Sequence, residues 1–311
     1  KAASYTGIRS ILPDGIPNNE GVFRVIEVTA PAGTIANNVM PAACAARGLT
    51  GFRMVDCIFG ALAKMLPEKV CAASDGGNSG VSIGGYDVDR KPYIYVDFAC
   101  GTWGGRPWGD GLQGNSNMFA NMASQSVEVI EAEQPVEILA YEFLPDRAGA
   151  GKFRGGAPYF RDYRFTEREA ILQVRSDRAR FRPYGLYGGM PGQPSANYLN
   201  PQDNNQKLTS KPTMIIQEGD VFRHELAGGG GWGDPLERDP ADVLRDVRNE
   251  LVSITSAKND YGVIIDNELI KVDSNKTNAL RKTMREKRAG AKLPFVAWDD
   301  HGTETALEAA E

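Results

Sequence analysis

The stretch HELAGGGGWGDP, residues 224–235, places five glycines in six positions around Trp232. Glycine runs let the backbone approach either a phosphate or another backbone segment, so two interpretations compete. A phosphate loop has the pattern GxxxxGK[ST], which occurs nowhere in the chain, and Asp234 would repel a phosphate held at this position. The run therefore favours close backbone packing, with Trp232 as a buried anchor, over a ligand-shaping loop or a nucleotide site.

The composition is that of a globular chain. Its 311 residues are 41% hydrophobic, enough for a sizeable core, and their formal net charge is −5. The absence of a long basic run argues against a nucleic acid partner, and no stretch approaches the roughly 18 apolar residues of a membrane helix. Without CxxC spacing, the cysteines are predicted to be buried free thiols of a cytoplasmic protein: Cys44, Cys57, Cys71 and Cys100.

Hydrophobic periodicity predicts an α+β fold with a mixed first part, a β-rich middle and a helical C-terminal extension. In residues 1–126, FRMVDCIFGALAKMLPEKV has helical spacing and a proline stop, and PYIYVDFACGTWGG is a strand that runs into a glycine turn. A further strand is expected over residues 23–29. The chain opens at Lys1, not Met, in a segment that already has a structured pattern, so we expect it to be the later part of a longer protein.

The pattern changes twice after residue 126. Residues 127–233 have a period of two in short runs, namely VEVIEAE, VEILAYEFLP, PYFRDYRF, AILQVRS and TMIIQEGDVFRHEL. Residues 234–311 turn helical: DPADVLRDVRNELVS carries an Asp cap and a Pro at the first helical position, and SNKTNALRKTMREKRAG is expected to be capped by Ser274 or Asn275. The last residues, from 291, are expected to form a tail.

The densest group of polar residues follows the strand that ends in the glycine turn, within residues 101–133. Rigid aromatic rings beside amide, carboxylate and guanidinium groups favour a polar-lined substrate pocket, although Asn and Gly are equally typical of plain turns. Asp110 and Arg106 are the catalytic candidates. The substrate-binding candidates are Trp103, Trp108, Asn115, Asn117 and Asn121.

Other side chains give weaker signals. The chain has two histidines; His224 is expected to hydrogen-bond within a strand and His301 lies in the tail, so no metal site made by this chain alone is predicted. No GxSxG elbow marks a serine nucleophile. Four arginines within eight residues have the chemistry to clamp a carboxylate or phosphate, and pairing with acidic residues of a neighbouring subunit is the favoured interpretation: Arg175, Arg178, Arg180 and Arg182.

Taken in order, several phrases resemble the hydantoinase B/oxoprolinase (N-methylhydantoinase B) family from about residue 8 to about residue 266. They are NNEGVFRVIEVTAPAGT, PAACAARGLTGFRMVDCIFGALAKMLPEKVCAAS, GGRPWGDG, VEVIEAEQPVEI, GAGKFRGG, RFRPYGLYGGMPG, GDVFRHELAGGGGWGDPLERDPADVLRDV and YGVII. The resemblance implies a B-type subunit that works with an A-type subunit, which binds ATP with its Mg²⁺ and phosphorylates the substrate. Members of the family hydrolyse cyclic amides or carboxylate ketones.

Two departures from the family pattern matter. Its His-containing metal-ligand segments lie upstream in full-length relatives, so the resemblance implies that a divalent metal would come from a missing N-terminal portion of the same subunit. The run GDGLQGNSNMFANMAS has asparagines where hydrolase members carry His and Thr.

We therefore predict part of the B-type subunit of an ATP-dependent cyclic-amide hydrolase of the hydantoinase or 5-oxoprolinase type, within a hetero-oligomer. The alternatives are the equivalent subunit of a ketone carboxylase of the acetone or acetophenone type, and a non-catalytic assembly subunit.

Overall fold

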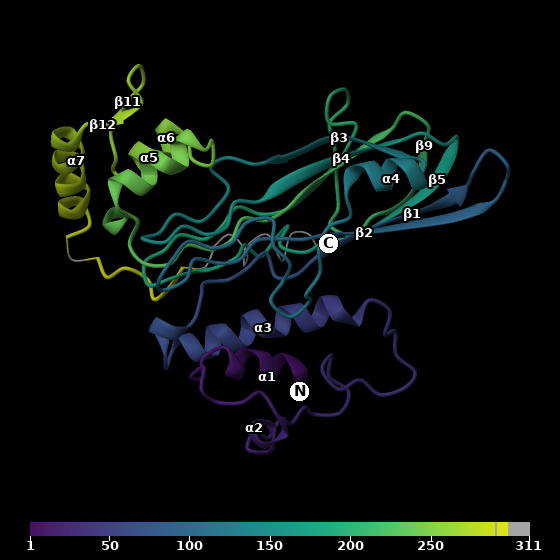
Figure 1. Cartoon of the computed structure of the whole chain (residues 1–311), viewed down its shortest axis with the longest axis horizontal. Coiled ribbons are helices and arrows are strands. Elements are labelled where there is room, and N and C mark those ends of the chain that lie inside the picture. Colours follow the sequence, from purple (N-terminus) through teal and green to yellow (C-terminus); the bar gives the residue numbers. More distant parts are fainter. Residues whose placement is uncertain (290, 298–311) are drawn as a thin grey trace, which may run out of the picture.

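Two antiparallel sheets pack face to face and enclose the largest hydrophobic core (Figure 1). In the computed structural model, which describes residues 1–289 and 291–297, buried Ile83 pairs in register with buried Leu172, and Phe222 packs from the opposite sheet. The first sheet has the strand order β2 (Pro92–Ala99), β1 (Ser79–Tyr86), β5 (Glu169–Arg175) and β9 (Thr213–Gln217). The second has the order β3 (Val136–Phe143), β4 (Tyr159–Phe165), β10 (Val221–Glu225), β7 (Ala196–Leu199) and β8 (Gln206–Leu208).

Beside the sandwich, segments 101–112, 147–156, 184–193 and 228–233 pack backbone against backbone; we call them the glycine hub. A Cβ added to any of four consecutive glycines would fall 1.9–2.1 Å from a carbonyl oxygen of another segment: Gly228 from Arg147, Gly229 from Trp103, Gly230 from Tyr184 and Gly231 from Ala150. Only a residue without a side chain fits there.

The amide groups of the same glycines are all used inside the protein. The N–H groups donate in order to the carbonyl oxygens of Gln193, Gly156, Ala73 and Met190. No amide is left to converge on a phosphate, so the backbone-packing interpretation is confirmed. The expectation that Trp232 is buried is wrong: its side chain is half-buried, with its ring stacked on Tyr187 at 5.3 Å between centroids.

Helices at the N-terminal end cover one side of the hub, below it in Figure 1. α1 (Ala2–Arg9) packs on α3 (Arg47–Ala63), where a Cβ on Gly7 would lie 2.5 Å from Ile58. α3 buries Val55 and Phe59 in a cluster with Tyr184, whose hydroxyl donates to the carbonyl of Asp56 at 2.8 Å. The expected helix is confirmed, with the short turn η1 (Pro67–Lys69) after it.

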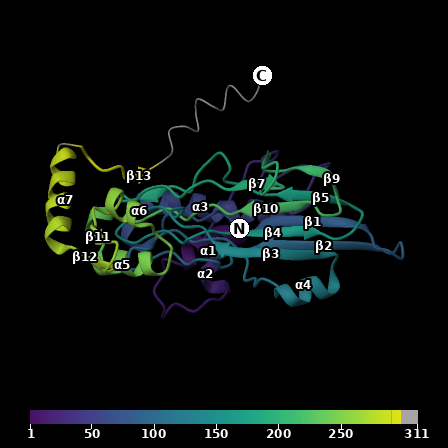
Figure 2. The ribbon, with the colours of Figure 1, turned by 90° about the horizontal axis from the view of Figure 1, so that it is seen from above.

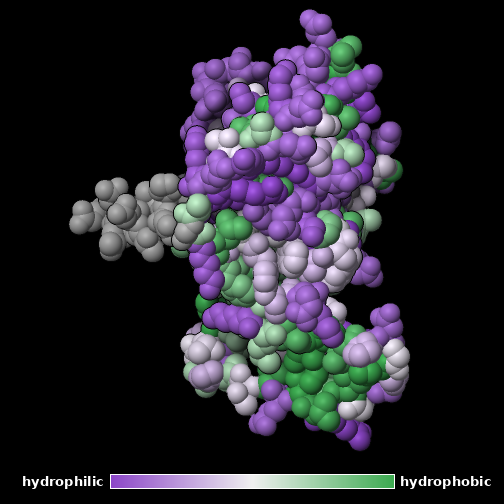
Figure 3. Space-filling model, turned by 90° about the vertical axis from the view of Figure 1, so that its left-hand side faces the viewer, coloured by the Kyte–Doolittle hydropathy of each residue, from purple (hydrophilic) through white to green (hydrophobic). Residues whose placement is uncertain are grey.

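The C-terminal helices form the opposite side, with a hydrophilic outer surface that contrasts with the hydrophobic surface at the α1 to α3 end (Figure 3). They are α5 (Pro240–Arg248), α6 (Ile254–Asn259) and α7 (Ser274–Lys287), and they follow the turn η2 (Pro235–Glu237). Two short pairs complete this part, β11 (Ile265–Asp266) with β12 (Lys271–Val272) and β13 (Val296–Ala297) with β6 (Gly185–Leu186). α7 and the hairpin between β1 and β2 lie at opposite ends of the molecule (Figure 2).

Three local expectations are wrong. Residues 23–29 are not a strand, because the Asn19 side chain accepts from the N–H of Gly21 and caps the helix α2 (Glu20–Arg24). VEVIEAE forms the helix α4 (Val127–Glu133), which buries Ile130 against the sandwich core. The cap of α7 is Asp273, which accepts from the N–H of Lys276 at 3.0 Å, and not Ser274 or Asn275.

The α+β fold class is confirmed. The expected boundaries near 126 and 234 fall at the residues that precede α4 and η2, and the division into three parts stays a prediction.

All four cysteines are free, but only Cys71 and Cys100 are buried, so the expectation of burial is wrong for Cys44 and Cys57. Within the described ranges, no helix combines the length and apolarity needed to cross a bilayer. His301 lies outside the described residues.

Candidate functional site

A cavity of about 550 Å³ opens between α1, α3 and the loop of residues 103–118. Its walls are mostly apolar and aromatic, from Tyr5, Phe23, Phe59, Trp103 and Trp108. The cavity is large enough for a small organic substrate. It lies at the hydrophobic end of the molecule seen in Figure 3.

The glycine hub fixes the loop that carries the predicted site residues. A Cβ on Gly105 would lie 2.4 Å from the carbonyl oxygen of Phe153, and one on Gly111 would lie 2.2 Å from that of Trp103. The indole N–H of Trp103 donates to the carbonyl of Ser116 at 2.8 Å, which holds this ring in the wall. Trp108 is 64% exposed and forms part of the rim.

Arg106 closes a tight turn at the cavity wall. Its backbone exchanges two hydrogen bonds with Gly109, and its guanidinium Nε and Nη2 donate to the carbonyl of Asp110 at 3.0 and 2.7 Å. The guanidinium is therefore held in one place. Its third nitrogen, Nη1, has no hydrogen-bond partner among the described residues.

The charges on the cavity wall are all positive. Arg9, Lys69 and Arg106 line it, and no Asp or Glu is among the lining residues that the structure describes. Cys71 also faces the cavity, where burial and then the negative charge of Asp56 raise the pKa of its thiol to about 12. The thiol stays protonated near neutral pH, so it is poorly suited to act as a nucleophile.

Asp110 faces away from this cavity and into a buried ion-pair network. Its two carboxylate oxygens accept from Arg238 at 2.6 and 2.7 Å, and Arg238 also donates to Asp246 at 2.7 Å. Arg154 joins Asp246 from the hub at 3.2 Å. Burial would raise the pKa of Asp110, but the hydrogen bonds and charge of Arg238 outweigh it and lower that pKa.

Arg106 links the cavity to a second, polar cleft of about 550 Å³ that contains Asp110 and Asn115. The structure therefore gathers Trp103, Arg106 and Trp108 in one cavity and Asp110, Asn115 and Arg106 in the other.

The remaining two asparagines lie elsewhere on the loop. Asn117 is buried; its backbone N–H donates to the side-chain oxygen of Asn78 and its own side chain accepts from the N–H of Phe119. Asn121 is exposed, with φ at 51°, and its side chain makes no hydrogen bond within the described ranges. A catalytic or substrate-binding role stays a prediction for every residue of the set.

Residues 1–235 match the family model described as hydantoinase B/oxoprolinase. The chain belongs to this family. The B-type subunit of a putative D-/L-hydantoinase of Pseudomonas sp. (strain NS671) is 32% identical over 289 residues, covering 90% of this chain and 48% of the relative. The beta subunit of caprolactamase of Pseudomonas jessenii is 31% identical over 276 residues, covering 84% of this chain and 47% of the relative. The chain spans about half the length of these family members.

Two solved structures have the same fold. The crystal structure of the ATP-dependent caprolactamase from Pseudomonas jessenii superposes with a TM-score of 0.79 at 27% identity, covering 90% of this chain and 50% of that one. Nucleotide-free acetone carboxylase superposes with a TM-score of 0.74 at 18% identity, covering 94% of this chain and 44% of that one. At 18% identity, the comparison with acetone carboxylase shows a shared fold alone.

Sequence reasoning missed the half of the cavity that α1, α3 and η1 supply. Arg9, Phe59, Lys69 and Cys71 lie far from loop 103–118 along the chain, and nothing in their local patterns distinguishes them from surface or core residues. Across residues 1–289 and 291–297, no three His, Cys, Asp or Glu side chains gather as ligands for a metal ion.

Proposed function

We propose that this chain is part of the B-type subunit of an ATP-dependent cyclic-amide hydrolase, and that it acts with an ATP-binding A-type subunit. A hydantoinase and an ATP-dependent caprolactamase are among its relatives, and both names refer to hydrolysis of a cyclic amide. The free cysteines, two of them exposed, support the cytoplasm as its compartment, since that compartment keeps thiols reduced.

The observation that carries the proposal is a cavity lined by three cations, with no carboxylate among the lining residues that the structure describes. Phosphorylation of an amide oxygen produces an anionic intermediate on a small ring. The aromatic wall fits the ring, and Arg9, Lys69 and Arg106 provide an attractive potential for the phosphate. Trp103 and Trp108 would keep bulk water from the intermediate before the productive step.

Arg106 is the residue we assign to the phosphorylated oxygen. Its guanidinium is already fixed by the carbonyl of Asp110, so it needs little reorganisation to stabilise developing charge. Asp110 acts as a positioning residue, because its carboxylate fixes Arg238 while its carbonyl fixes Arg106. Asn115, Asn117 and Asn121 would contact the substrate or hold the loop around it.

ATP and Mg²⁺ bind to the partner subunit in this scheme. The internal use of all four amides of Gly228–Gly231 supports it, because the one run that resembles a phosphate loop offers no donor to a nucleotide. We assign the ligands of any divalent metal to a further N-terminal portion of the same subunit.

Reconstitution with an A-type subunit from the same organism tests the proposal. ATP-dependent ring opening of a hydantoin, caprolactam or 5-oxoproline is the expected result. Arg106→Gln should lower kcat by about a hundredfold or more, as loss of a group that stabilises developing charge does. Arg180→Gln, which removes an exposed arginine outside the cavity, should leave kcat and KM unchanged.

Two outcomes would replace the proposal. Bicarbonate-dependent consumption of acetone or acetophenone without ring opening would assign the chain to the carboxylase type, for which the fold shared with acetone carboxylase is the available support. If Arg106→Gln and Asp110→Ala both keep full activity while loss of the chain abolishes complex formation, the chain is a non-catalytic assembly subunit.

A further inference from the structure

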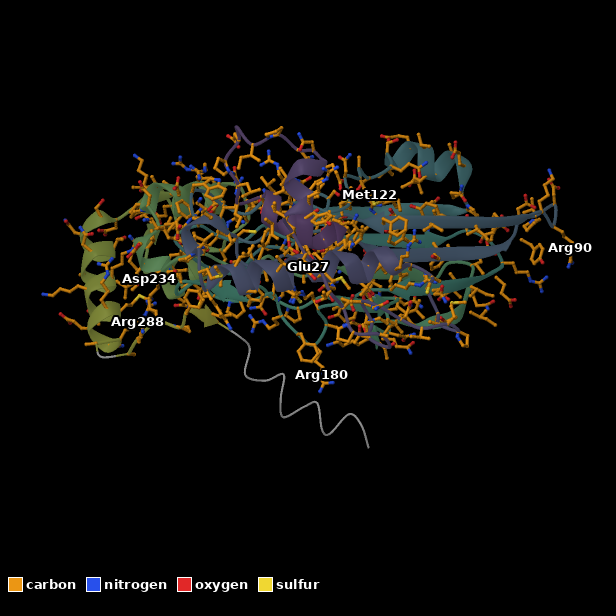
Figure 4. The ribbon with its side chains drawn as sticks, turned by 90° about the horizontal axis from the view of Figure 1, so that it is seen from below. Glu27, Arg90, Met122, Arg180, Asp234 and Arg288 are labelled. Carbon is orange, nitrogen blue, oxygen red and sulfur yellow. The ribbon has the colours of Figure 1, made fainter. Side chains whose placement is uncertain are left out.

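The four arginines between residues 175 and 182 have separate places in the structure. Arg178 pairs with Asp56 at 2.7 Å, and Arg182 donates to the carbonyl of Gly192 at 2.7 Å, so both brace the fold. Arg180 is exposed and points away from the body of the molecule (Figure 4). Arg175, at the end of β5, lies in a groove.

This groove has a volume of about 440 Å³ and lies between the first turns of α3 and the region where β5 ends and β9 begins. One wall is aliphatic, from Ile35, Ala45 and Leu49. Charged residues complete the lining, with Arg53 from α3 and Arg175, Asp177 and Lys211 from the segments around β5 and β9. We call it the β5–α3 groove.

Positive charge exceeds negative charge in the β5–α3 groove. Arg53 and Lys211 share the carboxylate of Asp177, at 3.2 and 2.8 Å. Burial tends to raise the pKa of Asp177, but the hydrogen bond from Lys211 and the charge of Arg53 outweigh it and lower that pKa. Arg175 donates to the side chain of Gln173, a neutral partner. Three cations thus face one carboxylate on a chain whose net charge is −5.

We propose that the β5–α3 groove docks an acidic segment of a partner polypeptide. The excess of cations selects negative charge, and the aliphatic wall receives the apolar residues between the acidic ones. An extended segment fits better than a small anion, because Ile35 is 84% exposed and Lys211 is 61% exposed. Small-ligand sites enclose most of their ligand, which so open a groove does not do.

A labelled eight-residue peptide of alternating Glu and Leu, with a Gln-for-Glu peptide as control, tests this docking by fluorescence anisotropy. We expect saturable binding of the Glu peptide and about tenfold weaker binding of the Gln peptide. Arg175→Glu should weaken binding of the Glu peptide by about tenfold or more, and the milder Arg175→Gln by less. The matched control is Arg180→Glu, which makes the same charge change outside the groove and should leave binding nearly unchanged.

Three results would overturn the proposal. Equal loss in Arg175→Glu and Arg180→Glu would show a non-specific charge effect. Displacement of the peptide by pyrophosphate at similar concentration would show a small-anion site. Tight peptide binding only after removal of residues 298–311, which contain Asp299, Asp300 and Glu304, would assign the groove to the chain's own acidic end. None of these measurements depends on the hydrolase activity.

Discussion

The sandwich and the glycine hub are two ways of building a solid interior. In the sandwich, side chains such as Ile83, Leu172 and Phe222 fill the space between two sheets, and the stabilising contribution comes from buried apolar surface. In the hub, segments meet at distances that exclude every side chain, and backbone hydrogen bonds dominate. A sandwich core tolerates a change of side chain at some cost in stability, whereas the central positions of the hub tolerate none.

The two regions also treat a buried carboxylate differently. In the sandwich, Asp97 accepts hydrogen bonds from Arg161 at 2.5 Å and from Tyr163 at 2.6 Å. At the edge of the hub, Asp75 accepts from the N–H of Gly77 at 3.1 Å and lies where a Cβ on Gly101 would fall. Burial raises the pKa of Asp75 to about 7, against the opposing charge of Arg53. The carboxylate of Asp97 therefore has a charged donor, whereas the carboxylate of Asp75 accepts from a backbone N–H.

The largest effect should come from adding one methyl group to the hub. Gly230→Ala places a Cβ 2.0 Å from the carbonyl oxygen of Tyr184. Moving either backbone to relieve this clash would break hydrogen bonds to the neighbouring segments of the hub. We expect a loss of more than about 4 kcal/mol in the free energy of unfolding, or no folded protein at all. Urea unfolding measures it. Gly15→Ala is the control, because no atom lies within 4 Å of its Cβ; equal stability of the two variants would contradict rigid backbone packing.

The next largest effect is a pH dependence of stability that comes from Asp75. The folded-state pKa of Asp75, about 7, is above its ordinary value of 3.8. The stability that the protonated carboxyl contributes to the free energy of unfolding is therefore complete below pH 4 and is lost as pH rises through 7. The cost of ionisation is on the order of 4 kcal/mol. Asp75→Asn removes this dependence and should gain stability relative to the wild type between pH 4 and 8, as measured by urea unfolding at each pH. Parallel pH profiles of the two proteins would disprove the shift.

A core truncation in the sandwich should cost less than the hub substitution. Leu172 is fully buried, and Leu172→Ala removes apolar contacts and leaves a cavity, for a loss of about 3 kcal/mol in the free energy of unfolding. The variant should still fold. Leu269→Ala, at a position that is 65% exposed, should change stability by less than about 0.5 kcal/mol. The comparison fails if Leu172→Ala is more damaging than Gly230→Ala.

The smallest effect on stability is expected where the hub holds a side chain out toward the cavity. Trp108 is 64% exposed, so Trp108→Ala should change the free energy of unfolding by less than about 0.5 kcal/mol. Reconstituted activity should fall with Trp108→Ala, because the rim then admits water. Trp103→Ala serves as the contrast: it loses the hydrogen bond to Ser116 and should lower both the thermal midpoint and activity. An unchanged activity in Trp108→Ala would remove that residue from the site.

Local patterns predicted most elements and failed at particular ones. The period of two located β3, β4, β5, β9 and β10, and the proline stop after α3 was placed correctly. VEVIEAE was misread because its alternation also satisfies a short helix that buries only Ile130, and a single buried position cannot separate the two. The site was predicted in part: Trp103 and Arg106 share the cavity, but Asp110 faces an ion-pair network whose partner, Arg238, is 128 positions away.

The sequence by itself determined the class of fold, the family, and the places of β2, β3, β4, β5, β9 and β10. Glycine runs and hydrophobic periods are local features, so they can be recognised without knowing what each residue contacts. Tertiary structure alone decided what each glycine approaches, which arginines brace the chain and which face a groove, and which side chains close the cavity. Those outcomes depend on contacts between segments far apart in the chain, and such contacts leave no period or spacing in the sequence.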